Sequence, residues 1–138
     1  MDDPLPHYPG YALRRAANAS AAELSVRLAE IGLRQVDASV LMLVAANPDI
    51  TASALGRALD IQRANMVPLL KRMEDGGLLD RIPLDGKSQG LILTEAGHGA
   101  HSRALTVIEA FESELLARVP AQHRAHLLPA LNALWRDG

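Results

Sequence analysis

The sequence contains no cysteine, which excludes disulfide bonds, thiol redox switches, thiolate zinc sites and cysteine catalysis. Aromatic residues are also scarce, since the chain has only Tyr8, Tyr11, Phe111 and Trp135. The core must therefore be aliphatic, built from Leu, Ala, Val and Ile, and a core of this kind suits helices better than sheets.

Long apolar runs and a strong net charge are missing as well. No apolar segment approaches the ~20 residues needed to span a bilayer, and the N-terminus lacks the pattern of a signal peptide, so we expect a cytoplasmic protein. The 138 residues carry a formal net charge of −2, with 49% hydrophobic and 22% charged residues. This composition is typical of one globular domain, and any nucleic-acid binding must come from local clustering of cations.

Apolar spacing predicts most of the chain as helix. Helical patterns cover residues 11–32 and 37–46, and Thr51 is placed to cap a short third helix. A fourth helix is expected from about Gln62 to Asp75, and two adjacent helices of this kind make a helix-turn-helix pattern. The buried stripe expected in the fourth helix is Met66, Leu69, Leu70 and Met73.

A hairpin and further helices follow this pattern. Residues 78–82 and 91–93 are predicted strands, and the segment between them carries the Asp-Gly turn signal at 85–86. Thr94 can cap a long helix that begins near Glu95. The order of helices followed by a hairpin is that of a winged helix-turn-helix, which places its second helix in the DNA major groove and its hairpin, the wing, near the minor groove.

The local charge supports DNA binding. Between Arg57 and Arg72 there are four basic residues and a single acid, Asp60, and the hairpin adds Arg81 and Lys87. Such an excess provides the phosphate neutralisation that supplies much of the affinity for DNA. At the start of the second helix of the pair, Arg can read guanine, and Asn or Gln can read adenine.

Five segments of the sequence resemble the MarR family of transcriptional regulators. The residues that carry the resemblance are 32–41, Thr51–Gly56, Ile61–Val67, Leu70–Arg81 (LKRMEDGGLLDR) and Leu93–Gly97 (LTEAG). The resemblance implies a mainly α fold, with a winged helix-turn-helix and its two-stranded β-hairpin wing at residues 35–94. It also implies dimerisation helices at 1–34 and 95–138, and a homodimer that reads a pseudo-palindromic operator in double-stranded DNA. Many members of the family are repressors that a small aromatic ligand releases from DNA.

The predicted DNA contacts come from the helix-turn-helix and the wing. They are Thr51, Ser53, Gln62, Arg63, Ala64, Asn65, Met66, Pro68, Lys71, Arg72, Arg81, Lys87 and Ser88. Some of these have structural alternatives: Gln62, Arg63 and Asn65 could cap or solvate a helix start, and Arg63 could form an ion pair with Asp60. We expect Lys71 and Arg72 to contact phosphates or to be solvated.

Two positions depart from the family pattern. The wing turn, Asp85–Gln89, carries a single cation where relatives usually have several arginines, so its contact with the minor groove should be weaker. Pro68 lies inside the recognition helix, the predicted helix from about Gln62 to Asp75. It removes a backbone hydrogen bond, and we expect a bend or a loosened turn there.

A second cluster near the N-terminus indicates a ligand. His7, Tyr11, Arg14 and Arg15 would suit an aromatic carboxylate or its coenzyme A thioester, with His101 as a further polar group. The alternative is that this arm anchors against the partner subunit. The histidine pairs 98/101 and 123/126 fit an exposed polar face better than a metal site, and we expect neither a metal nor a cofactor.

Two other classes of function compete with DNA binding. An enzyme would need a nucleophile with its base, paired carboxylates in a cleft or a metal, and the sequence contains no such motif. A winged-helix adaptor for protein–protein contact would present an apolar or acidic recognition helix, whereas this one carries basic and amide side chains.

Overall fold

The computed structural model describes residues 1–136 and confirms the mainly helical fold with a two-stranded hairpin. The elements in chain order are η1 (Leu5–His7), α1 (Pro9–Ala29), α2 (Gln35–Ala46), α3 (Ala52–Leu59), α4 (Arg63–Asp75), β1 (Leu79–Pro83), β2 (Gln89–Leu93), α5 (Glu95–Ala117), η2 (Ala121–His123) and α6 (Arg124–Asn132).

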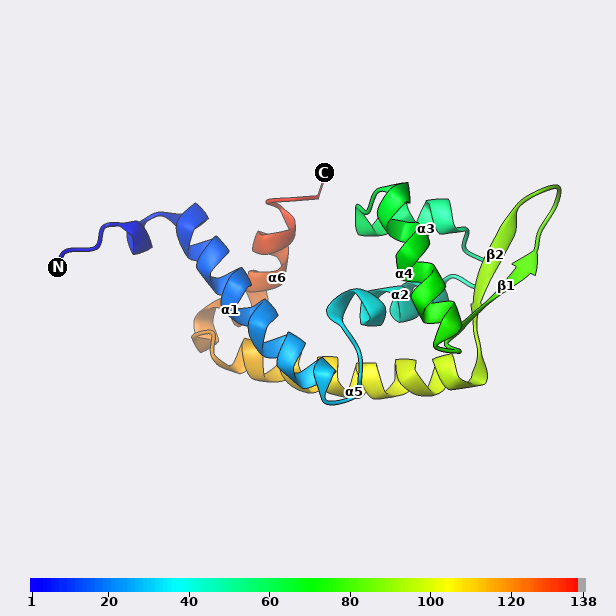
Figure 1. The fold of residues 1–138 in the computed structure, drawn as a ribbon. Helices are drawn as coiled ribbons and strands as arrows, with labels where there is room; N and C mark the ends of the chain where they lie inside the picture. Colours follow the sequence, from blue (N-terminus) through cyan, green and yellow to red (C-terminus); the bar gives the residue numbers. More distant parts are fainter. Residues whose placement is uncertain (137–138) are drawn as a thin grey trace.

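The long helix α5 connects two parts of the molecule (Figure 1). One end of α5 joins the hairpin, and α2, α3 and α4 lie above this end. The other end leads to α6, and α1 lies beside both, with η1 extending beyond it. Helix α5 contacts both α1 and α2, so it connects the winged part to the terminal helices.

Helix ends and turns are fixed by local hydrogen bonds. The hydroxyls of Thr51 and Thr94 accept hydrogen bonds from the backbone N–H groups of Ala54 (3.1 Å) and Gly97 (2.9 Å), which confirms both predicted caps. Helix α4 begins one residue later than expected, at Arg63. A glycine is required at position 97, because a side chain there would place its Cβ only 2.1 Å from the backbone oxygen of Leu78.

The root of the wing is attached to the start of α3. Strands β1 and β2 pair antiparallel from Leu79↔Leu93 to Pro83↔Gln89. The N–H of Leu91 then donates to the carbonyl of Ile50 at 2.8 Å, just before α3 begins. The wing is therefore hydrogen-bonded to the segment that leads into α3.

The core of the winged part is aliphatic, as the composition predicts. Leu41, Leu55, Leu70, Leu79 and Leu91 are fully buried, and they come from α2, α3, α4 and both strands. The predicted buried stripe of α4 is confirmed, since its four members are 9% exposed or less. Burial of this apolar surface is the main term that holds the helices to the hairpin.

A row of ion pairs among four side chains of alternating charge connects α1 with the C-terminal part of α5. Arg27 pairs with Glu23 on α1 and with Glu114 on α5, and Arg118 donates to Glu23 at 2.9 Å. The hydrogen bond from Arg118, supported by Arg27, lowers the pKa of Glu23 below its ordinary value. The guanidinium of Arg27 also lies 5.6 Å from the centre of the Phe111 ring.

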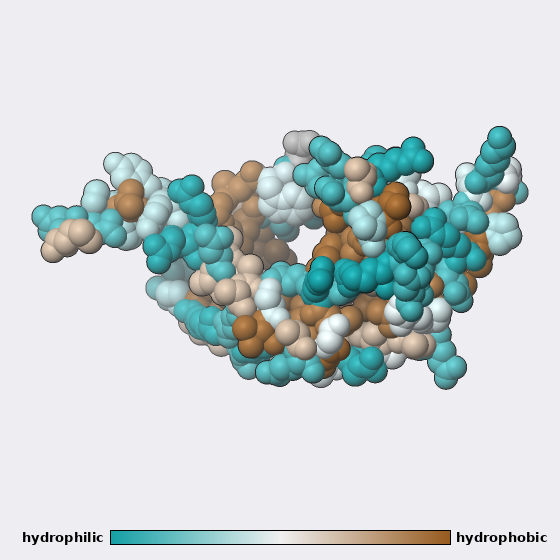
Figure 2. Space-filling model, viewed as in Figure 1, coloured by the Kyte–Doolittle hydropathy of each residue, from teal (hydrophilic) through white to brown (hydrophobic). Residues whose placement is uncertain are grey.

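Much apolar surface on the terminal helices is left uncovered in the single chain. Exposed side chains include Val26 on α1, Leu116 on α5, and Leu128, Leu134 and Trp135 in and after α6. Figure 2 shows apolar side chains on the α6 side of the opening between α6 and the winged part. In residues 1–136, no helix is both long and apolar enough to cross a membrane.

Candidate nucleic-acid interface

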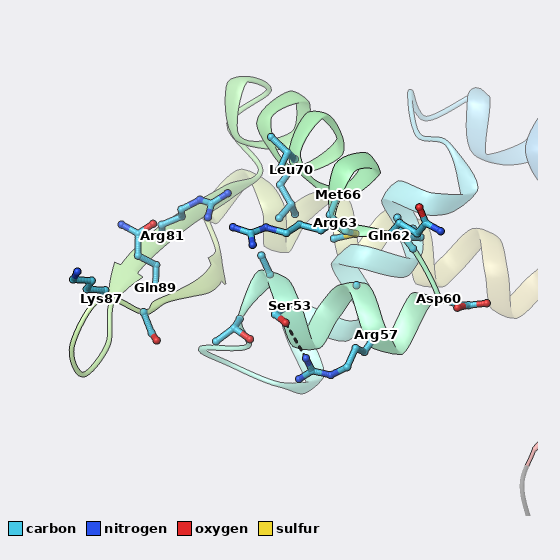
Figure 3. A pocket seen from close by; sticks show the side chains of 16 residues that line it. Ser53, Arg57, Asp60, Gln62, Arg63, Met66, Leu70, Arg81, Lys87 and Gln89 are labelled. Atoms are coloured by element: carbon cyan, nitrogen blue, oxygen red, sulfur yellow. Dashed lines mark hydrogen bonds between the residues drawn. The ribbon is translucent and has the colours of Figure 1, made fainter.

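A groove of about 710 Å³ lies between α3, the start of α4 and the wing (Figure 3). Polar and basic side chains from all three elements line it, among them Ser53 and Arg57 from α3, Arg63 from α4, and Arg81 and Lys87 from the wing. The fold therefore brings together residues that lie more than thirty positions apart in the sequence.

Eight of the thirteen predicted DNA contacts line this groove: Thr51, Ser53, Gln62, Arg63, Met66, Arg81, Lys87 and Ser88. In Figure 3 the side chain of Arg63 extends from α4 toward the wing, where Arg81 and Lys87 lie. Met66 is only 3% exposed, so its side chain belongs to the core and the prediction of a DNA contact there is wrong.

The basic residues of the winged part differ in what they pair with. Lys71 pairs with Asp75 at 3.0 Å and Arg81 pairs with Glu74 at 2.6 Å. Within residues 1–136, the alternative ion pair between Arg63 and Asp60 does not form, and neither Arg57 nor Lys87 pairs with a carboxylate. Arg57 instead donates to the Ser53 hydroxyl at 2.8 Å.

Arg72 is paired within the chain, which favours a structural role over the predicted phosphate contact. Its guanidinium donates two hydrogen bonds to the carboxylate of Asp37, at 2.5 and 3.2 Å. Asp37 is 2% exposed and also accepts the N–H of Arg34 at 2.9 Å, at the start of α2. The bond to Asp37 raises the pKa of Arg72. The pair joins the recognition helix to α2, and we therefore do not count Arg72 among the proposed phosphate contacts.

The remaining candidates lie outside the main groove. Asn65 and Pro68 line a second hollow of about 500 Å³, beside Arg72 and the start of α2. Ala64 and Lys71 are exposed and line neither hollow. Helix α4 continues through Pro68 as far as Asp75. The bend or loosened turn expected at Pro68 stays a prediction.

The predicted contacts left out eight residues that line the groove: Ala52, Gly56, Arg57, Asp60, Ile61, Val67, Leu70 and Gln89. Val67 is the apolar one among those of them that are exposed. Val67 is 61% exposed and lines the groove together with Arg63. Its exposure could have been inferred, because position 67 lies off the buried stripe at 66, 69, 70 and 73. An exposed valine on a helix expected to enter DNA was the available signal.

Comparison with known proteins agrees with this geometry. A profile described as the MarR family matches residues 31–88. The solved structure of the transcriptional repressor CouR bound to a 23-mer DNA duplex is 31% identical, with a TM-score of 0.88, and the match covers 96% of this chain and 95% of that one. The chain belongs to the MarR family. Its winged helix-turn-helix is therefore the family's fold.

Two further comparisons concern MarR-family proteins and their ligands. CouR bound to p-coumaroyl-CoA matches 100% of this chain and 99% of that one, at 28% identity and a TM-score of 0.86. The repressor Rv2887 of Mycobacterium tuberculosis is 27% identical over 130 residues, which is 93% of this chain and 94% of Rv2887. A structure of Rv2887 in complex with p-aminosalicylic acid has a TM-score of 0.74 at 26% identity, over 94% of this chain and 99% of that one.

The predicted ligand cluster is partly assembled in this MarR-family chain. Arg15 donates to the Tyr11 hydroxyl at 2.8 Å, and the guanidinium carbons of Arg14 and Arg15 lie 5.9 and 5.8 Å from the Tyr11 ring centre. His7 is exposed in η1, before this cluster. His101 is half-buried in the first part of α5, which Figure 1 shows on the wing side, away from η1. One chain alone therefore does not bring His101 to the other four.

Proposed function

We propose that the protein is a homodimeric, sequence-specific DNA-binding repressor that an aromatic carboxylate or its coenzyme A thioester releases from its operator. The observation that carries the proposal is the groove in which side chains of α3, the start of α4 and the wing converge. The proposal includes no catalytic step, and we propose that the regulator acts on chromosomal DNA in the cytoplasm.

Each part of the groove suits one part of a duplex. Gln62 and Arg63 begin α4, and side chains at the start of a recognition helix reach base edges in the major groove. Lys87 lies in the wing turn, where it suits the minor groove or a phosphate. Helix α3, which crosses the DNA backbone in such modules, carries Ser53 and Arg57 and is capped by Thr51. These side chains are therefore suited to phosphate contacts.

The dimer is proposed to form through residues 1–34 and 95–138, and residues 35–94 are proposed as the DNA-binding module. The exposed apolar side chains of α1, α5 and α6 need a partner, and an obligate helical interface of over ~2,000 Å² would cover them. Light scattering should then give twice the chain mass of 14.8 kDa. A 14.8 kDa particle at low micromolar concentration would overturn the dimer.

Selection of duplexes from a random pool by the purified protein tests the DNA-binding proposal. The expected product is a pseudo-palindrome with half-sites centred about one helical turn, ~10 bp, apart. The genes beside the matching genomic sites would then identify the regulated operon. Recovery of no common sequence would contradict sequence-specific binding and favour an adaptor that binds another protein.

The ligand is proposed to act at the cluster of Tyr11, Arg14 and Arg15, with His7 from the arm and His101 as a further polar group. The two guanidiniums can receive a carboxylate or a phosphate, because neither pairs with a carboxylate within residues 1–136. A ligand bound on α1 would favour a spacing of the two winged modules that misses the second half-site. A tenfold loss of DNA affinity requires ~1.4 kcal/mol of preferential binding to that state.

Titration of the protein–DNA complex with benzoates, cinnamates and their thioesters tests this site. At least one compound should lower the DNA affinity, and Arg15→Ala should abolish that response. DNA binding without ligand should stay within a few-fold of the parent. If Arg15→Ala responds as the parent does, the cluster is a structural anchor of the N-terminal arm.

A further inference from the structure

Val67 is the apolar residue among the exposed residues that line the groove, since the apolar residues Ile61, Met66 and Leu70 of its lining are half-buried or buried. The other large exposed hydrophobic side chains of the described chain lie in the N-terminal arm, in α1, α2, α5 and α6, and just after α6. The dimer is proposed to bury such surface on α1, α5 and α6. Val67 instead lines the groove between α3, α4 and the wing, and it is 61% exposed. The dimer proposed above therefore does not explain it.

Helix stability does not explain Val67 either. A β-branched residue loses side-chain freedom in a helix, and a residue that precedes proline is disfavoured in helical geometry. Val67 has both disadvantages, because it stands directly before Pro68 within α4. A residue that destabilises its own helix, and is not buried in the core in return, is expected where its side chain contacts something outside the chain.

The major groove of DNA offers one apolar group, the 5-methyl of thymine. We propose that Val67 packs against a thymine methyl in each half-site and so determines part of the operator sequence. This inference rests on the proposed DNA-binding function and goes beyond it by naming a base. The basic side chains around Val67 would hold the duplex, and the valine would add a preference that a phosphate contact cannot give.

The position of Val67 relative to Arg63 restricts where the thymine lies. The two residues are four positions apart on α4, so they lie on one face of the helix, about 6 Å apart along its axis at ~1.5 Å per residue. Base pairs rise by about 3.4 Å. If Arg63 contacts a guanine, the thymine should therefore lie within two base-pair steps of it.

The test replaces each thymine of the selected duplex in turn with deoxyuridine, which keeps base pairing and removes only the methyl. One thymine per half-site should show a loss of affinity of about fourfold, the value for one buried methyl group, and replacement in both half-sites should give roughly 15-fold. Val67→Ala should bind the parent duplex more weakly and lose this dependence on the methyl.

Two controls make the result specific. Asn65→Ala removes another predicted DNA contact of α4, one that lines the second hollow, so whatever it does to the overall affinity it should retain the full ratio between thymine and uridine duplexes. Arg63→Ala identifies the guanine that Arg63 contacts. Replacing that guanine should weaken binding by the parent protein but not by Arg63→Ala. The inference is overturned if no thymine shows the effect, if Val67→Ala retains it, or if the thymine lies more than two steps from that guanine. In each of these cases specific DNA binding itself stands, whereas failure to bind any selected duplex refutes the proposed function instead.

Discussion

Arg72→Met should destabilise the fold much more than Asp37→Asn, although the two substitutions break the same ion pair. The side chain of Asp37 is 3% exposed, whereas that of Arg72 is 41% exposed. When Arg72 is removed, a carboxylate remains in the core with only the Arg34 N–H as a partner. When Asp37 becomes an amide, Arg72 can turn into water.

Magnitudes follow from this asymmetry. Loss of one partner of a buried pair costs about 3–5 kcal/mol, and the partial exposure of Arg72 reduces this to about 2–4 kcal/mol for Arg72→Met. Asp37→Asn keeps an oxygen that can accept the Arg34 N–H and should cost about 1 kcal/mol. Lys71→Met is the matched control on the same helix, since Lys71 and Asp75 are 73% and 66% exposed and their pair contributes at most about 0.5 kcal/mol.

Urea unfolding of the three variants and the parent, at one fixed protomer concentration, measures these costs. The expected order of stability is parent, Lys71→Met, Asp37→Asn and Arg72→Met, with similar dependence on urea. If Arg72→Met lies within about 0.5 kcal/mol of the parent, the assignment of Arg72 to structure is wrong and its phosphate contact is open again.

Three further predictions concern the groove and the terminal helices. Arg63→Ala should cost about 1–3 kcal/mol of binding and relax the base preference at one position of each half-site, measured by competition among single-base variants; an unchanged preference would make Arg63 a structural residue. Lys87→Ala should reduce the slope of log affinity against log salt by about 1 to 2, through one phosphate in each half-site, whereas loss of Arg72 should leave it unchanged. Because Arg118 and Arg27 lower the pKa of Glu23, its carboxylate stabilises the fold above its ordinary pKa near 4.5, and this contribution disappears as the pH falls through the lowered value. Glu23→Gln should therefore lower the melting temperature at pH 7 and have little effect at pH 2, and an equal effect at both would contradict this.

Local signals in the sequence predicted most of the fold. The hydroxyls of Thr51 and Thr94 cap helices by accepting a hydrogen bond from the backbone N–H three residues later. The Asp-Gly turn joins two strands that are neighbours in the sequence. Such features depend on a few consecutive residues. The spacing of Met66, Leu69, Leu70 and Met73 likewise predicted which face of α4 is buried.

The site was harder to predict because its energetics depend on distant partners. Arg72 and Asp37 lie 35 positions apart, and no periodicity connects them. The same holds for Arg81, whose bond to Glu74 depends on how the wing returns against α4. Met66 was assigned both to the core and to DNA, and only the packing of α4 decides between them.

The salt dependence of binding to the selected duplex tests the DNA-binding groove most directly. Arg57, Arg63 and Lys87 lack a carboxylate partner within residues 1–136, which gives six such cations in a dimer. The expected slope of log affinity against log salt is then about −5, and affinity should fall about 10³-fold from 50 to 200 mM salt. A scrambled duplex of equal length should bind far more weakly at every salt concentration. A flat salt response, or equal affinity for both duplexes, would contradict the assignment of this groove to operator DNA.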